Sequence, residues 1–398
     1  MGVRAAAVTR ITCIALAGAL LANCGLPTPQ PEIPRELLFI TTNGTCAFLT
    51  CFSNAVAVAS RDGSTVADLR SASRILVRLG ASATVAEGYL VRDKPPFGID
   101  RFRIGSSLTT EVIMSQNVSG AALVEAPGLP AVAGSRSVLI TKVGTNTGCD
   151  VVGYQAGSEI WRQPIDPNKC MITYENVAQL GGLAVLVDPG PWPKAVVVPE
   201  TGKIRPLRQP STGCIAEGEI AERVLYECGQ GVGTPYVQVE GGPEVAVTNE
   251  FATNSFGVLE PSGKRELLVL SSTSYVRLDA LGRRLSDGDL GLGRRVSDGA
   301  IRVPSGRPAV SADGASLYLP TDRGVVVTSV VGGGTKTIAD PKTIAVAVSL
   351  DSRFLYALTV AGVSPKFRTR LDVIYLPTEQ RVASYSEDAS NILLVTRR

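Results

Sequence analysis

Residues 309–319 read AVSADGASLYL, and residues 347–357 repeat that pattern as AVSLDSRFLYA. The repeat distance from Ser311 to Ser349 is 38 residues. Each copy is followed by two further short runs that are rich in β-branched residues, which favour strands. Four strands that recur about every 40 residues are the sequence signature of propeller blades. The repeat therefore predicts a β-propeller in the C-terminal third of the chain.

Short strand-like runs of the same kind occur throughout the rest of the chain. Examples lie at residues 37–40, 55–58, 195–198, 267–270 and 324–327. Asp-Gly pairs, a strong signal for tight hairpin turns, begin at Asp62, Asp287, Asp298 and Asp313. No long amphipathic helical pattern interrupts them. The sequence therefore predicts an all-β fold, with two β-sandwiches in tandem as the alternative that the same strand pattern permits.

The two copies resemble the YVTN and lactonase-like β-propeller repeats, whose core pattern is Ser-x-Asp-Gly-x-x-Leu-Tyr. The resemblance covers about 80 residues in two blades, and residues 58–63 hold a fainter copy. It implies a single propeller domain over residues 37–398. The length of that domain favours seven blades, with six to eight open. We expect the strands at residues 37–40 and 391–395 to pair in one shared blade that closes the ring.

The first 23 residues have the organisation of an export signal. Arg4 and Arg10 form a basic region, and the apolar run at residues 11–22 is too short to span a bilayer. The run ends in LANC at residues 21–24, which resembles the lipobox of bacterial lipoproteins. That resemblance implies that Cys24 is lipidated and becomes the first residue of the mature chain. The alternative is an ordinary secretory signal, in which Cys24 has no such role.

A proline-rich segment, residues 24–36, separates this signal from the predicted domain. It holds four prolines and no periodic apolar pattern, so it is expected to be an extended, semi-rigid tether. Gly25 stands where an Asp would favour retention at the inner membrane in the lipoprotein family. The resemblance therefore implies a lipid anchor in the bacterial outer membrane, on the periplasmic face or at the cell surface.

Six further cysteines remain in the mature chain, an even number that favours disulfides in an exported protein. They form pairs of sequence neighbours: Cys46 with Cys51, Cys149 with Cys170, and Cys214 with Cys228. Six cysteines allow 15 connectivities, so this pairing is a hypothesis. A zinc site is disfavoured, because the chain has no histidine and no Cys-x-x-Cys spacing.

Three other motifs are better explained as turns than as sites. The run GGGTKT at residues 332–337 lacks the spacing of a phosphate-binding loop. The run DGD at residues 287–289 lacks the further oxygen ligands that calcium needs. The arginine pairs at residues 283–284 and 294–295 have aspartates nearby. We therefore expect a hairpin surface on which the positive and negative charges balance each other.

The chain has two tryptophans, for which the sequence predicts different roles. Trp161 lies within a strand-like run and is expected to pack between blades. Trp192 lies between two prolines and is the better candidate for contact with a partner.

The absence of histidine limits the chemistry that the chain can perform. It excludes a Ser-His-Asp or Cys-His nucleophile and histidine metal ligands. The charge is nearly balanced, with 39 Lys and Arg against 36 Asp and Glu, which disfavours a nucleic-acid partner. We therefore expect a non-catalytic, envelope-anchored scaffold without a cofactor, which binds an envelope protein or glycan. The alternative is a carboxylate- or calcium-dependent hydrolase or lactonase at the propeller channel.

Overall fold

Short antiparallel strands make up nearly all of the regular structure in the computed structural model. The structure describes residues 31–41, 46–47, 50–51, 55–69, 74–77, 86–92, 97–104, 107–115, 118–132, 135–145, 148–170, 172–189, 192–208, 210, 214–229, 236–246, 256–259, 266–270, 274–289, 309–311, 314–321, 324–329, 335–340, 342–361, 369–387, 389 and 391–397. The chain divides into two units, Met1–Ile33 and Pro34–Arg398, and all the described strands belong to the second.

Five sheets consist of four strands in sequence order from one edge to the other. They are β6–β9 (Arg74–Val77, Ala86–Arg92, Gly98–Ile104, Leu108–Met114), β18–β21 (Cys214–Ile220, Arg223–Cys228, Tyr236–Val239, Glu244–Ala246), β22–β25 (Phe256–Leu259, Glu266–Leu270, Ser274–Leu278, Arg284–Asp289), β26–β29 (Ala309–Val310, Ser316–Thr321, Gly324–Ser329, Thr335–Ile338) and β30–β33 (Thr343–Val348, Phe354–Val360, Thr369–Tyr375, Gln380–Glu387). The last two contain the sequence repeat, so each copy begins a blade as predicted.

An eight-stranded sheet supplies two more units of the same kind. Its halves are β10–β13 (Val118–Glu125, Ser137–Thr145, Gly148–Gln155, Ser158–Ile165) and β14–β17 (Asn176–Leu180, Leu183–Val187, Pro193–Val197, Ile204–Pro206). A single parallel pair, Gly120 with Val177, joins β10 to β14. The sheet therefore consists of two neighbouring blades whose first strands run in the same direction.

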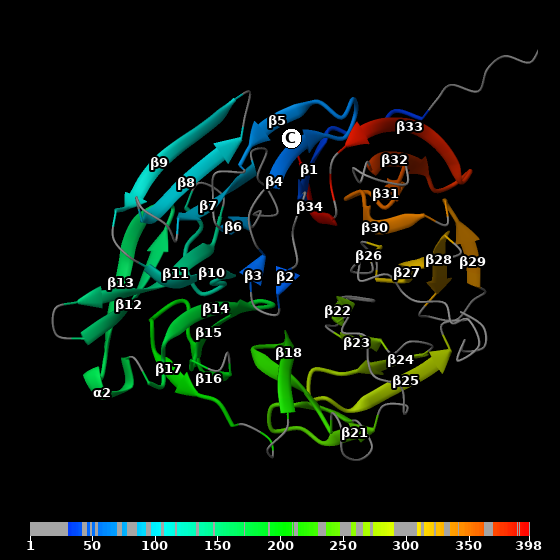
Figure 1. Ribbon diagram of the computed structural model, residues 1–398. Helices are drawn as coiled ribbons and strands as arrows, with labels where there is room; N and C mark the ends of the chain where they lie inside the picture. Colours follow the sequence, from blue (N-terminus) through cyan, green and yellow to red (C-terminus); the bar gives the residue numbers. More distant parts are fainter. Residues whose placement is uncertain are drawn as a thin grey trace, which may run out of the picture. The chain divides into compact units, whose positions relative to one another are not determined.

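The remaining four-stranded sheet joins the two ends of the domain. Its order is β34 (Asn391–Arg397), β1 (Glu36–Thr41), β4 (Ala55–Ala59) and β5 (Thr65–Asp68). The last strand, β34, pairs antiparallel with β1, with Leu38 opposite Val395. The two strands lie side by side in the ring of sheets in Figure 1. Residues 34–398 thus form a β-propeller, and the predicted closure by the N- and C-terminal strands is confirmed.

The described strands make eight four-stranded units, one more than the seven that the chain length favoured. The reason is the size of the connections, since many hairpins need only two to five residues. The connections that contain the cysteine pairs do not add a long insertion to every blade. Each blade is therefore short, and eight of them fit within the length of the domain.

The antiparallel order gives the ring two distinct ends. We name the end where the first strand turns into the second, and the third into the fourth, the turn face. The opposite end, where the second strand joins the third and one blade joins the next, is the cysteine face, because all six candidate disulfide cysteines lie there. The two longest connections, residues 42–54 and 290–308, also join strands at the cysteine face.

The sequence repeat encodes a turn at the turn face. The backbone amide of Ser316 donates to Ser311 Oγ at 2.9 Å, and the amide of Phe354 donates to Ser349 Oγ at the same distance. Ser352 has a φ of 56°, so it takes the left-handed conformation that Gly314 takes in the other copy. The serine of the motif therefore holds the turn between the first two strands of a blade. The fainter copy at residues 58–63 differs, because it connects the third strand to the fourth.

Glycines at the turn face also receive side chains from the preceding blade. Gly202 has a φ of 71°, and a Cβ added there would lie 2.5 Å from the ring of Trp161 on β13. Gly63 has a φ of 67° and meets the ring of Tyr385 on β33 at 2.6 Å in the same way. These glycines combine a left-handed turn with a close approach, so any side chain there would be strained and would clash.

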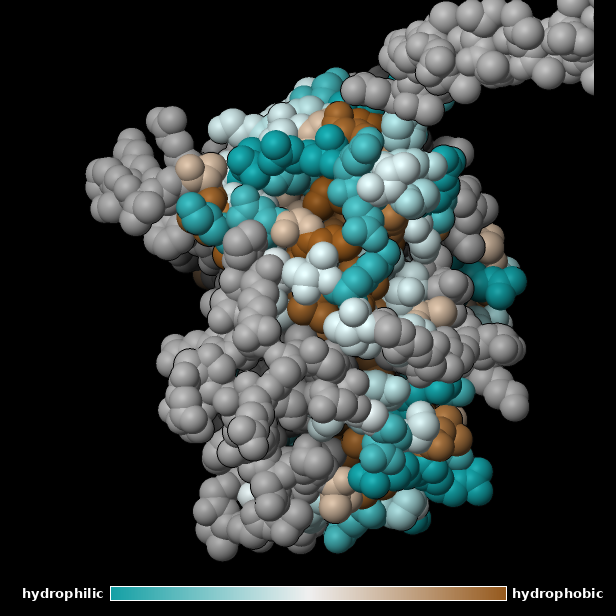
Figure 2. Space-filling view, turned by 90° about the vertical axis from the view of Figure 1, so that its right-hand side faces the viewer, coloured by the Kyte–Doolittle hydropathy of each residue, from teal (hydrophilic) through white to brown (hydrophobic). Residues whose placement is uncertain are grey.

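The core of the domain consists of apolar clusters in and between neighbouring blades. One cluster brings together Ile140 and Val151 with Leu186 and Val197, from the two blades of the eight-stranded sheet. The outermost strands β13 and β29 are mostly exposed, whereas the neighbouring strands β12 and β28 are mostly buried. Figure 2 shows mostly hydrophilic residues on the described surface of one side, with hydrophobic residues between them. The blades therefore bury their apolar faces against one another, as a propeller requires.

Candidate functional site

Two disulfides cross-link connections on the cysteine face. Cys149, at the start of β12, is bonded to Cys170 at the end of the one-turn helix α2 (Pro167–Cys170). Cys214 and Cys228 face each other across β18 and β19, with Cα atoms 4.1 Å apart. Both pairings match the sequence hypothesis. They fix Cys170 and Cys228, from which the chain leads into β14 and β20.

Cys46 and Cys51 occupy a small two-stranded sheet in the connection between β1 and β4. The sheet is β2 (Cys46–Ala47) with β3 (Thr50–Cys51), and its register places the two cysteines opposite each other. Their side chains lie outside the described residues. Cys24, the predicted lipidation site, also lies outside them. The described residues contain no helix long and apolar enough to cross a membrane.

A buried lysine supports the connection that the Cys149–Cys170 disulfide holds. Lys142, on β11, is 3% exposed. Its Nζ donates to the carbonyl oxygen of Cys170 at 2.8 Å and to that of Glu175 at 2.6 Å. Burial lowers the pKa of Lys142 below its ordinary value, and the Glu175 carboxylate opposes that shift. The cation thus satisfies two backbone carbonyls at both ends of residues 170–175.

This supported connection presents an apolar side chain to solvent. Ile172, two residues after the disulfide, is 74% exposed. Single exposed apolar residues are common on protein surfaces, so Ile172 alone does not mark a binding site. Its backbone neighbours are fixed, because the amides of Thr173 and Tyr174 donate to the carbonyl oxygen of Lys169.

Trp192 lies on the same face, in the connection between β15 and β16. Its backbone amide donates to Asp188 Oδ1 at 3.0 Å, and its carbonyl oxygen accepts from the Asp188 amide at 3.0 Å. Asp188 is also paired with Lys194, whose Nζ lies 3.0 Å from Oδ2. The Trp192 side chain is 41% exposed. Asp188 therefore closes the loop and holds an exposed tryptophan in a defined position.

Trp161 has the packing role that the sequence predicted. Its Nε1 donates to the carbonyl oxygen of Pro199 at 2.7 Å, in the next blade. Its ring fills the space above Gly202. The two tryptophans therefore differ, since Trp161 joins blades and Trp192 faces solvent.

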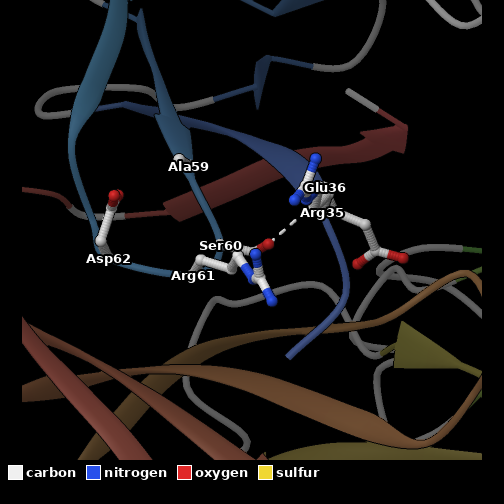
Figure 3. Close-up of a pocket in the computed structure, with 6 residues that line it drawn as sticks. All are labelled: Arg35, Glu36, Ala59, Ser60, Arg61 and Asp62. Carbon is white, nitrogen blue, oxygen red and sulfur yellow. Dashed lines mark hydrogen bonds between the residues drawn. The ribbon is translucent and has the colours of Figure 1, made fainter. Parts of the chain in front are cut away.

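A cavity of about 430 Å³ lies at the turn face, where the chain enters the domain. Its lining, drawn in Figure 3, consists of Arg35, Glu36, Ala59, Ser60, Arg61 and Asp62. The side chains of Glu36 and Asp62 point in different directions in that view. Asp62 Oδ1 accepts from the backbone amide of Ser64, as in other tight turns. The cavity therefore does not present two carboxylates to a common point.

The buried carboxylate of Glu36 joins the closing blade to its neighbour. Its Oε2 accepts a 2.6 Å hydrogen bond from the Tyr356 hydroxyl, and its Oε1 accepts one of 2.9 Å from the Leu350 amide. Burial and the Glu36 carboxylate raise the pKa of Tyr356 well above its ordinary value, so the hydroxyl remains a donor. Glu36 therefore links the closing blade to its neighbour.

Asp287 and Gly288 lie within strand β25, opposite Val276 and Tyr275, so the turn predicted for residues 287–289 is wrong. The arginines at residues 283–284 form ion pairs with nearby aspartates. Arg283 Nε donates to Asp279 Oδ2 at 2.8 Å, and Arg284 lies 3.8 Å from Asp287. Residues 294–295 and 332–334 lie outside the described part, and so does the side chain of Asp289. Among the described residues, no group of three or more Cys, Asp or Glu side chains is placed to hold a metal ion.

Comparison with known proteins gives no family. No protein-family model matches the sequence, and no curated protein matches it either. Apo AztD from Citrobacter koseri is similar in structure, with a TM-score of 0.49 and 10% identity over 91% of this chain and 98% of that one. A Bacteroides fragilis protein named as a 6-phosphogluconolactonase has a TM-score of 0.44 and 10% identity, over 93% of this chain and 98% of that one. We draw nothing about function from likenesses this distant.

Sequence reasoning missed three residues that organise these surfaces. Lys142 lies in the apolar strand SVLITKVGT, and a lone lysine there was the available signal. Glu36 and Asp188 each stand at a strand end, where a charged residue is unremarkable. Lys142 and Glu36 act through contacts with segments far away in sequence, which no local pattern encodes, whereas Asp188 bonds to Trp192 only four residues away.

Proposed function

We propose that the chain is an envelope-anchored lipoprotein whose β-propeller is a non-catalytic binding scaffold. Its lipid anchor is Cys24, in the outer membrane, and its partner is an envelope protein or glycan that docks on the cysteine face. The observation that carries the proposal is the loop closed by Asp188, which holds Trp192 exposed on a face braced by two disulfides. Exposed aromatic residues in rigid settings are frequent binding hot spots.

The acidic residues of the turn-face cavity support a scaffold over an enzyme. Glu36 is engaged by Tyr356 and by a backbone amide, and Asp62 stabilises its own turn. A carboxylate pair for hydrolysis needs both groups directed at the same substrate bond. Both carboxylates instead accept hydrogen bonds that stabilise the closing blade.

The anchor is tested by fractionation of two serine variants. Cys24→Ser should release the protein from the membrane fraction, because the acylated thiol is lost. Cys13→Ser is the matched control, since it also removes a cysteine from the first 24 residues and should leave fractionation unchanged. Retention of Cys24→Ser in the membrane would contradict the proposal.

The scaffold assignment is tested on the purified soluble domain, residues 25–398. We expect calcium to leave its thermal midpoint unchanged and a panel of lactones and esters to remain unhydrolysed. A calcium-dependent rise in the midpoint together with turnover would favour the hydrolase instead.

A further inference from the structure

We infer that the anchored propeller is oriented, with its turn face toward the membrane and its cysteine face presented away from it. The inference rests on the proposed anchor at Cys24 and specifies which surface that anchor leaves available. It follows from where the chain enters the domain, how firmly that point is held, and how long the tether is.

The chain enters the propeller at the turn face. The first strand, β1, begins at Glu36 and is the second strand of the closing blade. In every blade the second strand begins at the turn face, because the first strand has just turned there. Residues 34–36 therefore lie at that face, next to the turn at residues 60–64 that connects β4 to β5.

Hydrogen bonds hold this point to the turn beside it. Ser60 Oγ donates to the carbonyl oxygen of Pro34 at 2.5 Å and accepts from the Glu36 amide at 3.0 Å, the bond drawn in Figure 3. The Ser60 amide donates to the Glu36 carbonyl oxygen at 3.0 Å. The Glu36 carboxylate adds the bonds to Tyr356 and Leu350 in the neighbouring blade. Two blades therefore fix the residue from which the tether leaves.

The tether is only about as long as the path to the other face. Pro34 lies ten residues after Cys24, and at about 3.1 Å per residue this segment spans about 31 Å when extended as polyproline II. A path to the cysteine face around the outside of the ring passes β4 and β5, at about 4.8 Å per strand, and then runs about 20 Å along a six-residue strand. That detour takes about 30 Å and leaves no length to reach a membrane. The turn face, by contrast, is reached directly.

The experiment measures energy transfer to an acceptor lipid in vesicles that carry the full-length lipidated protein. A donor dye is attached through a clickable amino acid at residue 201 or at residue 192, which flank β16 at the turn face and the cysteine face. Residues 379 and 361 form a second pair in the blade next to the closing blade, and their native side chains are exposed. The second pair controls for tilt of the ring.

We expect a greater loss of donor fluorescence at 201 than at 192, and at 379 than at 361. Adding Cys24→Ser should remove transfer from all four sites. Equal transfer within each pair, or greater transfer from 192 and 361, in membrane-bound protein would overturn the orientation alone. Absence of transfer at every site, with the unsubstituted protein soluble, would overturn the lipid anchor and the orientation together.

Discussion

The two faces of the propeller are stabilised by different means. The turn face relies on backbone geometry, with left-handed residues such as Gly63, Gly202 and Ser352 and with serine and aspartate side chains that bond to their own turns. The cysteine face relies on cross-links between distant segments, namely two disulfides and the Lys142 ammonium. Cross-links tolerate longer and more varied loops than tight turns do. This difference is the reason why we propose the cysteine face as the binding face.

The largest expected loss of stability comes from adding a side chain at Gly202 on the turn face, where the backbone lies against the ring of Trp161. Gly202→Ala should lower the free energy of unfolding by about 3 kcal/mol, because a left-handed alanine costs about 1 kcal/mol or more and the clash with Trp161 adds to it. Gly241→Ala is the matched control, since its φ is 74° and nothing lies within 4 Å of the added Cβ. Denaturant unfolding of both variants measures the difference. Equal losses of unfolding free energy in the two variants would show that the close contact between Gly202 and Trp161 does not contribute to the effect.

Removing the Cys149–Cys170 disulfide should destabilise the cysteine face and spare the turn face. The double serine variant is expected to lose about 3 kcal/mol by the chain-entropy argument, for a sequence separation of 21 residues. Hydrogen exchange should rise at residues 166–175 and stay unchanged in the turn at residues 198–203. The Cys214–Cys228 double variant is the control, with a similar global loss but no local increase at residues 166–175. Uniform exchange across both faces would contradict the comparison.

Breaking the bond between the closing blade and its neighbour should have a smaller effect. Tyr356→Phe leaves Glu36 Oε2 without the donor that it has at 2.6 Å and should cost about 2 kcal/mol. Tyr375→Phe, which removes an exposed hydroxyl bonded to Arg353, should cost less than about 0.5 kcal/mol. If urea midpoints shift equally in the two variants, the Glu36 contact does not contribute to closure.

Lys142 should give the cysteine face a pH-dependent stability. Because burial lowers its pKa in the folded state, the unfolded chain binds more protons between that lowered pKa and 10.5. Stability should therefore rise with pH across that window, while the neutral amine can still donate to both carbonyls. In Lys142→Met this rise should be absent. Parallel pH curves of unfolding free energy for the two proteins would contradict the assignment.

The smallest expected effect on stability is at Trp192. Trp192→Ala should change the free energy of unfolding by less than about 0.5 kcal/mol, because the side chain is 41% exposed and the loop is held through Asp188 and backbone groups. The same variant should lose binding of the envelope partner. Leu350→Ala, on the turn face with 42% exposure, is the matched control and should keep binding.

Much of the fold could be predicted from sequence because the blades are local. The Ser311 and Ser349 turns, the strands that follow them and the pairing of β1 with β34 all depend on short patterns or on the need to close the ring. The blade count could not be predicted, since it depends on how short each connection is. Residues 58–63 show the limit of prediction from local sequence, because a similar pattern there forms the turn between the third and fourth strands of the closing blade.

The candidate site was less predictable, and the reason is physical. The exposure of Trp192 was expected from its flanking prolines, and the even cysteine count predicted disulfides while their pairing stayed a hypothesis. The Asp188 loop closure is local, since Asp188 and Trp192 are four residues apart, but the burial of Lys142 and the Glu36–Tyr356 contact depend on atoms from segments far apart in sequence. Tyr356 is 320 residues from Glu36 in sequence, so no local pattern relates them.

The most direct test of the binding scaffold is site-specific photo-cross-linking in intact cells. A photoreactive amino acid at residue 192 should give an adduct of one discrete mass, and the same amino acid at residue 201, at the other end of β16, should give none. The adduct at 192 should disappear in the Cys149→Ser/Cys170→Ser background, which loosens that face. Adducts at 201 and none at 192 would contradict the account, because the partner would then dock on the turn face.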